Sequence, residues 1–199
     1  MFDRSILLAP SVQVAPLLLG AILSRGGVSL RITEVEAYQG SLDPGSHAFR
    51  GQTKRNSVMF GEPGHLYTYF TYGMHTCANI VCAPAGTASG VLVRAGEVIE
   101  GITAARERRP TSKSDSDLAR GPARLTRALG ITLADGGVDL EAGPVRLSLM
   151  PPTTDYVSGP RTGLSGPGGG AEYPWRFWLP GERSVSPYKK HSPKKRQHP

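Results

Sequence analysis

The sequence predicts one compact domain of mixed helices and strands with many loops. Its 199 residues match the usual size of a single domain, and 39 % hydrophobic residues permit a sizeable core. The 25 glycines and 17 prolines indicate many turns and argue against a helix bundle. We find no internal repeat and no second domain. The predicted organisation is therefore a domain over residues 1–186 and a basic, disordered tail over 187–199.

The first predicted element is a buried helix in the apolar run Ala15–Leu23, with Pro16 in its first turn and Gly26-Gly27 at its end. The run is far shorter than the roughly 20 residues that span a bilayer. Asp3 ahead of it and the lack of a small-residue cleavage site argue against a signal peptide. We therefore expect a cytoplasmic protein, associated with the nucleoid if bacterial, without membrane contact.

The next element is a strand over 28–38, in which apolar and polar residues alternate. Continued alternation places Glu34, Glu36 and Tyr38 on the same face as the apolar side chains. A buried carboxylate is costly unless it is hydrogen-bonded or functional, and a desolvated one is a natural general base. The alternative is that Glu34 or Glu36 faces solvent at the strand end. The pattern does not choose between the two.

Two further strands, Leu66–Tyr72 and Met74–Cys82, are expected to meet at Tyr72-Gly73 as a hairpin rich in aromatic residues. Tyr72 then lies exposed at a rigid tip, which suits insertion into a base stack. An ordinary sheet with aromatic cross-strand pairs is the alternative. The remaining expected elements are strand Val91–Arg94, helices Ile102–Arg109 and Pro122–Leu129, strand Val145–Leu149, a glycine-rich loop Gly159–Gly170 and a last strand in WRFWLPG.

Charge and cysteine content limit the classes of partner and site. The net charge is +7, and five of the basic residues follow Pro187, so the body carries 7 − 5 = +2. Such a tail suits a polyanionic partner or is simply a solvated terminus. On one strand Cys77 and Cys82 would face opposite sides, roughly 17 Å apart at about 3.3 Å per residue. We therefore expect free thiols in a reducing compartment. No metal site is expected, because neither HxxxH nor CxxC occurs.

The chain closely resembles the alkyladenine (3-methyladenine) DNA glycosylases of the mammalian type. The resemblance covers nearly everything except the tail. The matching stretches are EVEAYQG (34–40) with His47, RN..MF (55–60), PG.LY.Y..YGM (63–74) with Cys77 and Asn79, VLVRA (91–95), GPARL (121–125) and RTGLSG (161–166). The most specific of them are EVEAYQG and PG.LY.Y..YGM. The resemblance implies a single α+β domain around a curved antiparallel β-sheet, with a protruding β-hairpin and flanking helices.

The resemblance also implies a role for each matching residue. Glu36 is implied as the base that activates water, and Arg94 and the backbone carbonyl of Leu164 as groups that hold this water. The implied base-binding pocket consists of Tyr38, His47, Tyr69 and Asn79. DNA intercalation is implied for Tyr72 and Met74. Phosphate contacts are considered for Lys54, Arg55 and Arg124.

The implied activity is monofunctional. A damaged purine is flipped out of double-stranded DNA and its N-glycosidic bond is hydrolysed without a cofactor. We expect a monomer, because nothing in the sequence demands a larger assembly. Two departures from the family pattern are His75 after the YGM stretch, and Arg124 in place of a lysine. The residues alone also permit a non-catalytic nucleic-acid-binding module or a nucleoside hydrolase.

Overall fold

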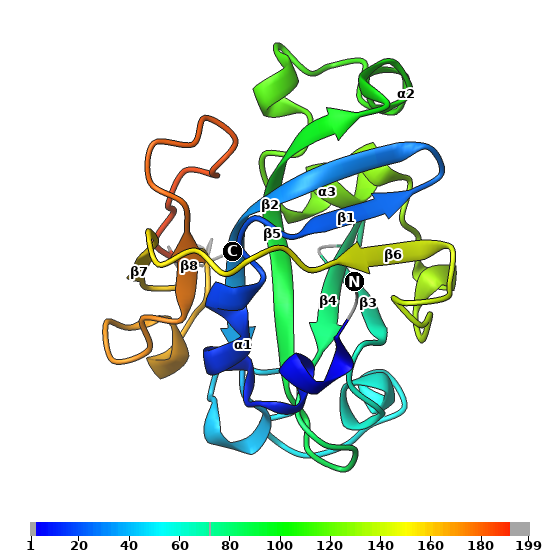
Figure 1. Cartoon of the computed structure of the whole chain (residues 1–199). Coiled ribbons are helices and arrows are strands. Elements are labelled where there is room, and N and C mark those ends of the chain that lie inside the picture. Colours follow the sequence, from blue (N-terminus) through cyan, green and yellow to red (C-terminus); the bar gives the residue numbers. More distant parts are fainter. Residues whose placement is uncertain (1–2, 72, 192–199) are drawn as a thin grey trace, which may run out of the picture.

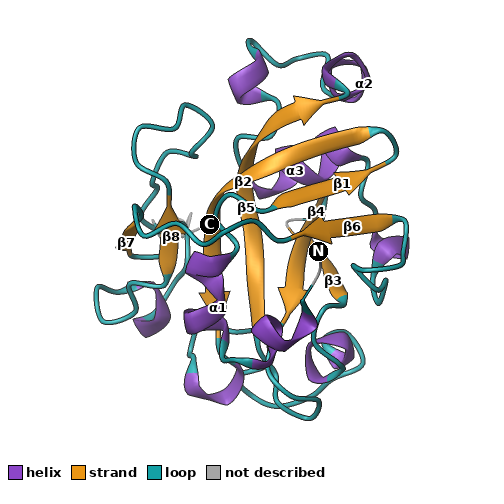
Figure 2. Cartoon of the chain, viewed as in Figure 1, coloured by secondary structure: helices purple, strands orange, loops and turns teal. Residues whose placement is uncertain are grey.

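The computed structural model describes residues 3–71 and 73–191, and within these ranges eight strands form one antiparallel sheet flanked by three α-helices (Figures 1 and 2). The strands are β1 (Ile22–Arg25), β2 (Val28–Tyr38), β3 (Leu66–Thr71), β4 (His75–Val81), β5 (Gly90–Glu100), β6 (Val145–Ser148), β7 (Val157–Gly159) and β8 (Arg176–Trp178). The helices are α1 (Ser11–Leu17), α2 (Ile102–Arg108) and α3 (Pro122–Leu129). Short 3₁₀ turns cover Arg4–Leu8, Gly40–Leu42, Ser57–Phe60, Asp115–Asp117, Leu133–Asp135 and Pro167–Gly169. The expected α+β class is confirmed.

The strand order along the main path is β3-β4-β5-β2-β1-β6. Strands β1 and β8 both pair with β2, β1 with its first half and β8 with its second half. Figure 1 shows β2 bending along its length between these two partners. The sheet is therefore curved as expected, and its middle strand carries both Glu34 and Glu36.

The prediction of one helix over Ala15–Leu23 is wrong. Helix α1 ends at Leu17, the chain turns at Gly20 with a positive φ of 84°, and the rest of the run is strand β1. Leu23 pairs with Leu30 of β2, and both side chains are fully buried. A short apolar run satisfies a buried helix and a buried strand equally well, so its periodicity could not reveal this break.

The dipeptide Gly26-Gly27 ends a strand rather than a helix. Both residues have positive φ, 55° and 77°, and they connect β1 to β2 as a two-residue hairpin loop. Positive φ at both central positions is the geometry that matches the twist of paired strands, and glycine adopts it without strain.

Most other elements lie where the sequence places them. Helix α3 begins at Pro122 and is followed by Gly130, whose φ of 75° ends the helix as expected. Strand β5 is longer than predicted, because it continues past Arg94 to Glu100. Gly96 allows this extension, since a Cβ there would lie 2.7 Å from the carbonyl oxygen of Arg31 on β2. Strand β7 was not predicted.

The alternation along β2 does not continue through the strand, so that prediction is also wrong. The residues of β2 in the hydrophobic core are Val28, Leu30, Ile32, Val35 and Ala37, which change from even to odd positions. The register between β2 and β5 shifts on both sides of Glu34, as in a β-bulge. An extra residue reverses the face of every side chain after it. Glu34 and Glu36 are therefore buried on the side of the sheet opposite the core residues.

One hydrophobic core joins α1, α3 and the inner residues of the sheet. A second, small cluster lies apart from it and contains Ala48, Met59, Tyr67, Val81 and Ala88. In the part of the chain that the structure describes, no helix has the length and apolar content to cross a membrane.

Candidate active site

A cavity of about 330 Å³ opens on the side of the sheet that carries Glu36. Its size is in the range of sites for small ligands. Seven residues that the sequence analysis singled out line it together: Glu36, Tyr38, His47, Tyr69, Asn79, Arg94 and Leu164. They come from strands β2, β3, β4 and β5 and from two loops. Neighbouring strands bring Glu36 and Asn79 into one region, because both residues pair with Leu92 of β5.

Glu36 lies at the wall of this cavity with both carboxylate oxygens engaged. The backbone N–H of Thr162 donates to Oε1 over 2.7 Å, and the Tyr38 hydroxyl donates to Oε2 over 2.9 Å. A guanidinium nitrogen of Arg94 lies 3.5 Å from Oε1. These contacts hold the carboxylate in one orientation. Burial, and then the charge of Glu36, raise the pKa of Tyr38 well above its usual value, so its hydroxyl keeps its proton at neutral pH.

Glu34 is buried as completely as Glu36 but does not line the cavity. Arg94 and Arg176 donate to its Oε1 through their Nε atoms, over 2.8 and 2.6 Å. Ser186 adds its hydroxyl to Oε1 over 3.0 Å and its backbone N–H to Oε2 over 2.7 Å. A carboxylate held by four donors away from the cavity serves to join parts of the chain.

Arg94 links the two carboxylates. Its Nε donates to Glu34, and its terminal nitrogen faces Glu36. Burial lowers its pKa, but the charges of Glu36 and Glu34 more than offset this, so the pKa is raised overall. A permanent cation therefore stands between the two acids.

Aromatic rings form another wall of the cavity. The rings of Tyr67 and Tyr69 lie 5.7 Å apart between centroids, nearly parallel, and His47 meets Tyr69 edge-on at 4.6 Å. His47 Nδ1 is 3.4 Å from the Tyr67 hydroxyl. Burial, and then the charge of Arg55, lower the pKa of His47, so the imidazole is neutral at neutral pH. The wall therefore presents aromatic rings without a cationic histidine.

Asn79 lines the cavity beside these aromatic residues. It pairs with Tyr67 across the hairpin, and its amide nitrogen donates to the Tyr67 carbonyl over 3.3 Å. Its side chain is buried within a strand, where an amide is unusual, and it lines the cavity. The hydrogen bond fixes the amide, so Asn79 is a rigid polar group at the cavity wall.

The remaining predicted residues that the structure describes lie outside the cavity lining. Met74 is 67 % exposed at the end of the β3–β4 hairpin, and Tyr72 lies outside the described residues. Lys54 and Arg55 are exposed on their loop, and the Arg55 guanidinium stands 5.9 Å from the Tyr69 ring centre. Arg124 forms an ion pair with Asp117 on the surface. Only Arg55 among the three basic residues contacts a cavity wall.

Several residues of the cavity were given no role in the sequence analysis. Thr162, which donates to Glu36, lies in the RTGLSG stretch but was given no role. Among the described residues its hydroxyl is the one buried side-chain polar atom without a hydrogen-bond partner. Met59 and Cys77 also line the cavity. The only signal for Thr162 in the sequence was its place in RTGLSG, a stretch that matches the family but in which Thr162 has no assigned role.

The two cysteines are free and lie on opposite sides of the sheet, as expected. Cys77 lines the cavity, whereas Cys82 belongs to the hydrophobic core. Burial raises the pKa of both thiols. In the described ranges no three His, Cys, Asp or Glu side chains lie close enough to hold a metal ion.

Comparisons with known proteins identify the family of the chain. The family model described as methylpurine-DNA glycosylase (MPG) matches residues 5–183. A protein of Leifsonia xyli with the provisional name 3-methyladenine DNA glycosylase is 60 % identical, over 94 % of this chain and 92 % of its own length. A protein of Streptomyces avermitilis with the same provisional name is 53 % identical, over 98 % of this chain and 94 % of its own. The chain thus belongs to the methylpurine-DNA glycosylase family.

Proposed function

We propose that this protein is a DNA repair glycosylase that removes alkylated or otherwise damaged purines from double-stranded DNA. The damaged nucleotide enters the cavity, water activated by Glu36 hydrolyses its N-glycosidic bond, and an abasic site remains. The observation that carries the proposal is the placement of Glu36, a buried carboxylate oriented by two donors at the wall of an aromatic cavity. A protein of the methylpurine-DNA glycosylase family acts as a DNA N-glycosylase, which is a hydrolase.

Selection of damaged bases follows from the aromatic wall. Alkylation of a purine at N3 or N7 leaves a cationic ring, and a cation over a tyrosine face gains about 0.5–2 kcal/mol. Tyr38, Tyr69 and the neutral His47 provide such surfaces without a repelling charge. Extrusion of a base costs a few kcal/mol and costs less when the base pairs poorly. We propose that Asn79, which lines the cavity, crowds the 2-amino group of normal guanine.

The chemical step needs only a positioned water. The water oxygen bonds to C1′ of the sugar as the bond from C1′ to the purine nitrogen breaks, and the bonding pair leaves with the purine. Glu36 accepts the proton from the water, and its charge stabilises the oxocarbenium character that develops at C1′. Arg94 and the Leu164 carbonyl would hold this water beside Glu36. No lysine is among the described residues of the cavity lining, so water is the nucleophile we propose.

The β3–β4 hairpin is the element that we propose to open the duplex. Met74 and Phe70 are exposed there, 67 % and 47 %, although both are large and apolar. Apolar side chains that enter a base step unstack it and let a nucleotide leave the helix. We propose Tyr72 as the wedge between the bases, beside Met74. Arg55, next to Tyr69, would contact a phosphate near the extruded nucleotide.

The test compares Glu36→Gln with wild-type protein on a duplex that carries one alkylated or etheno purine. Glutamine keeps the size of the side chain but is a poor base, so we expect retained binding and a loss of base release of at least 100-fold. Alkali-labile abasic sites measure the release. Glu34→Gln is the control: it disturbs the four-donor network, so it should lower the melting temperature, which Glu36→Gln should change little.

Other outcomes point to other functions. Base release by Glu36→Gln at nearly the wild-type rate would contradict the catalytic role of this residue. Duplex binding by wild-type protein without any base release would favour a non-catalytic binding module. Hydrolysis of free nucleosides without a duplex would favour a nucleoside hydrolase.

A further inference from the structure

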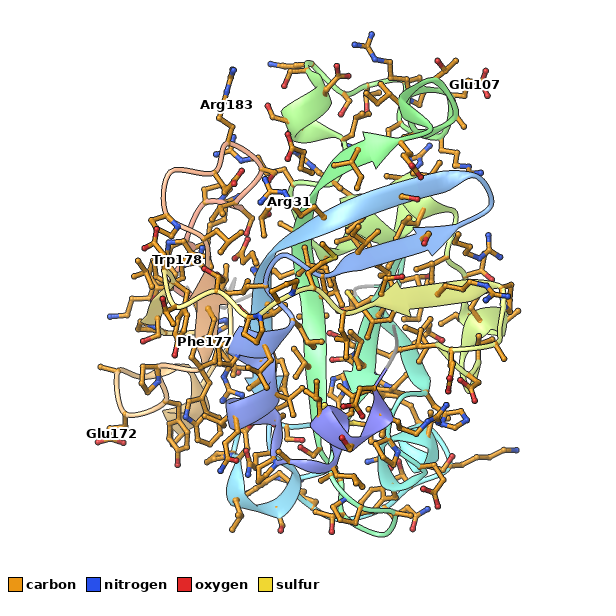
Figure 3. The ribbon with its side chains drawn as sticks, in the orientation of Figure 1. Arg31, Glu107, Glu172, Phe177, Trp178 and Arg183 are labelled. Carbon is orange, nitrogen blue, oxygen red and sulfur yellow. The ribbon has the colours of Figure 1, made fainter. Side chains whose placement is uncertain are left out.

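The chain continues past the end of the family match at residue 183 and remains attached to the body. Figure 3 shows Arg183 pointing outward from the loop that follows β8, and Figure 1 shows the later residues, in red, returning toward the sheet. The Ser184 hydroxyl lies 2.9 Å from the Thr33 hydroxyl, and Arg120 donates to the Val185 carbonyl over 2.8 Å. The described residues after this point, 184–191, are called the C-terminal extension, and their first residues are therefore a fixed part of the fold.

The firmest attachment is Ser186. Its N–H and hydroxyl donate to Glu34, and its carbonyl accepts from Arg176 over 3.0 Å. Two residues later, the Tyr188 ring lies 5.9 Å from the Arg176 guanidinium. The buried Glu34–Arg176 pair thus fixes the direction in which the chain leaves the body.

From there the extension reaches the cavity. The Lys189 carbonyl accepts a 2.7 Å hydrogen bond from the N–H of Gly163, the residue between Thr162 and Leu164. His191 is itself part of the cavity lining. The extension thus lies against the loop that holds Glu36 in place.

Lys189 and Lys190 are exposed at this position, and no acidic residue follows Pro187 in the sequence. The geometry points to residues 188–191 as a DNA-binding rim of the cavity, on which Lys189 and Lys190 contact backbone phosphates beside the extruded nucleotide. This inference rests on the proposed function, because it takes duplex DNA as the substrate.

Charge and position together favour DNA phosphates as the partner. A nucleotide that enters the cavity stays joined to the duplex through its two phosphates, so phosphates must pass its rim. Lysines near such phosphates release bound counterions, which gives sequence-independent affinity that falls with salt. A freely moving tail would give its charges no fixed position, whereas Lys189 is held by its own carbonyl.

The experiment measures the dissociation constant for a damaged duplex at several salt concentrations. The variant Lys189→Ala/Lys190→Ala is compared with Lys194→Ala/Lys195→Ala, which removes the same charge from a later part of the sequence. Each phosphate contact contributes about 0.9 to the slope of log affinity against log salt. We expect the first variant to reduce the slope by about 1–2 and the second by less than half of that.

Limited proteolysis of the wild-type protein provides a second measurement that needs no variant. Trypsin cleavage after Lys189 and Lys190 should slow when duplex is added, more than cleavage after Lys194 and Lys195. Equal slopes for the two variants, or equal protection of the two lysine pairs, would overturn the inference. These binding readouts do not depend on base release. An inactive wild-type protein with the expected slopes would contradict only the glycosylase proposal, whereas an active one with equal slopes would contradict only the rim.

Discussion

Glu34 and Glu36 carry the same functional group two residues apart on one strand, yet their partners differ. Glu34 accepts four hydrogen bonds, two from arginines and two from Ser186. Glu36 accepts from Thr162 and Tyr38 and lines the cavity. Both are buried, so burial alone does not distinguish the acid proposed as the catalytic base from a structural one. The number of protein donors and access to the cavity do.

The Thr162 hydroxyl gives a prediction at this scale. It is buried at the cavity wall without a hydrogen-bond partner among the described residues, which costs free energy in the unliganded protein. Thr162→Val keeps the shape and the N–H bond to Glu36. We expect an equal or higher melting temperature and a base release rate reduced about tenfold, because the hydroxyl is poised to hold the water or the substrate.

Single-turnover assays and thermal unfolding together check this prediction, and Thr162→Ser, which retains a hydroxyl, is the matched control. A valine variant with the full wild-type rate would show that the hydroxyl has no part in the reaction.

At the scale of elements, the loop from Gly159 to Gly170 is the most consequential segment. Arg161 holds it in place, since this fully buried side chain forms two 2.6 Å bonds to Asp43 and one of 2.8 Å to the carbonyl of Ala37 at the end of β2. Its guanidinium also stacks 4.6 Å from the Tyr38 ring centre. The next residue then presents its N–H to Glu36. One ion pair thereby joins two loops to strand β2.

Removal of this ion pair should be costly. Arg161→Met leaves the buried Asp43 without its charge partner, and breaking a buried pair in this way costs about 3–5 kcal/mol. Arg161→Met/Asp43→Asn removes both charges, so it should recover part of that loss. The midpoints of urea denaturation measure both effects. If the single and double variants were equally destabilised, or neither were, the buried ion pair would not be the cause.

At the scale of the whole molecule, the C-terminal extension packs against the sheet and completes the hydrogen bonds of the buried Glu34. Strands β2, β5 and β8 each contribute a side chain to the Glu34 network, and Ser186 completes it. The family match ends before this serine. Beyond this serine the chain keeps contact with the body, because His191 lines the cavity.

Two truncations test the contribution of the extension to stability. A stop after Arg183 removes both Ser186 donors from Glu34, and hydrogen bonds to charged groups contribute about 1.5–3 kcal/mol each. We expect this variant to lose about 3 kcal/mol or more of unfolding free energy. A stop after His191 keeps every named contact and should unfold like the full chain. Chemical denaturation measures both, and a first variant as stable as the full chain would contradict the role of Ser186.

Local signals were enough to determine several parts of this protein. Pro122 and Gly130 define α3 because both act on the backbone at the position they occupy. Alternating residues define the first half of β2, and the aromatic strands define the hairpin. The motif residues indicate the family and, through the resemblance, select Glu36 over Glu34. All of these signals act within a few residues of one another.

Only the tertiary structure determined the rest, because the deciding partners are distant in sequence. Asp43 meets Arg161 across 118 residues, and Glu34 meets Ser186 across 152. The division of Ala15–Leu23 into helix and strand depends on pairing with β2, and the bulge beside Glu34 depends on register with β5. That bulge places Glu34 and Glu36 on the side of the sheet opposite the core. The sequence therefore identified the two residues, whereas only the assembled sheet determined the direction in which their side chains face.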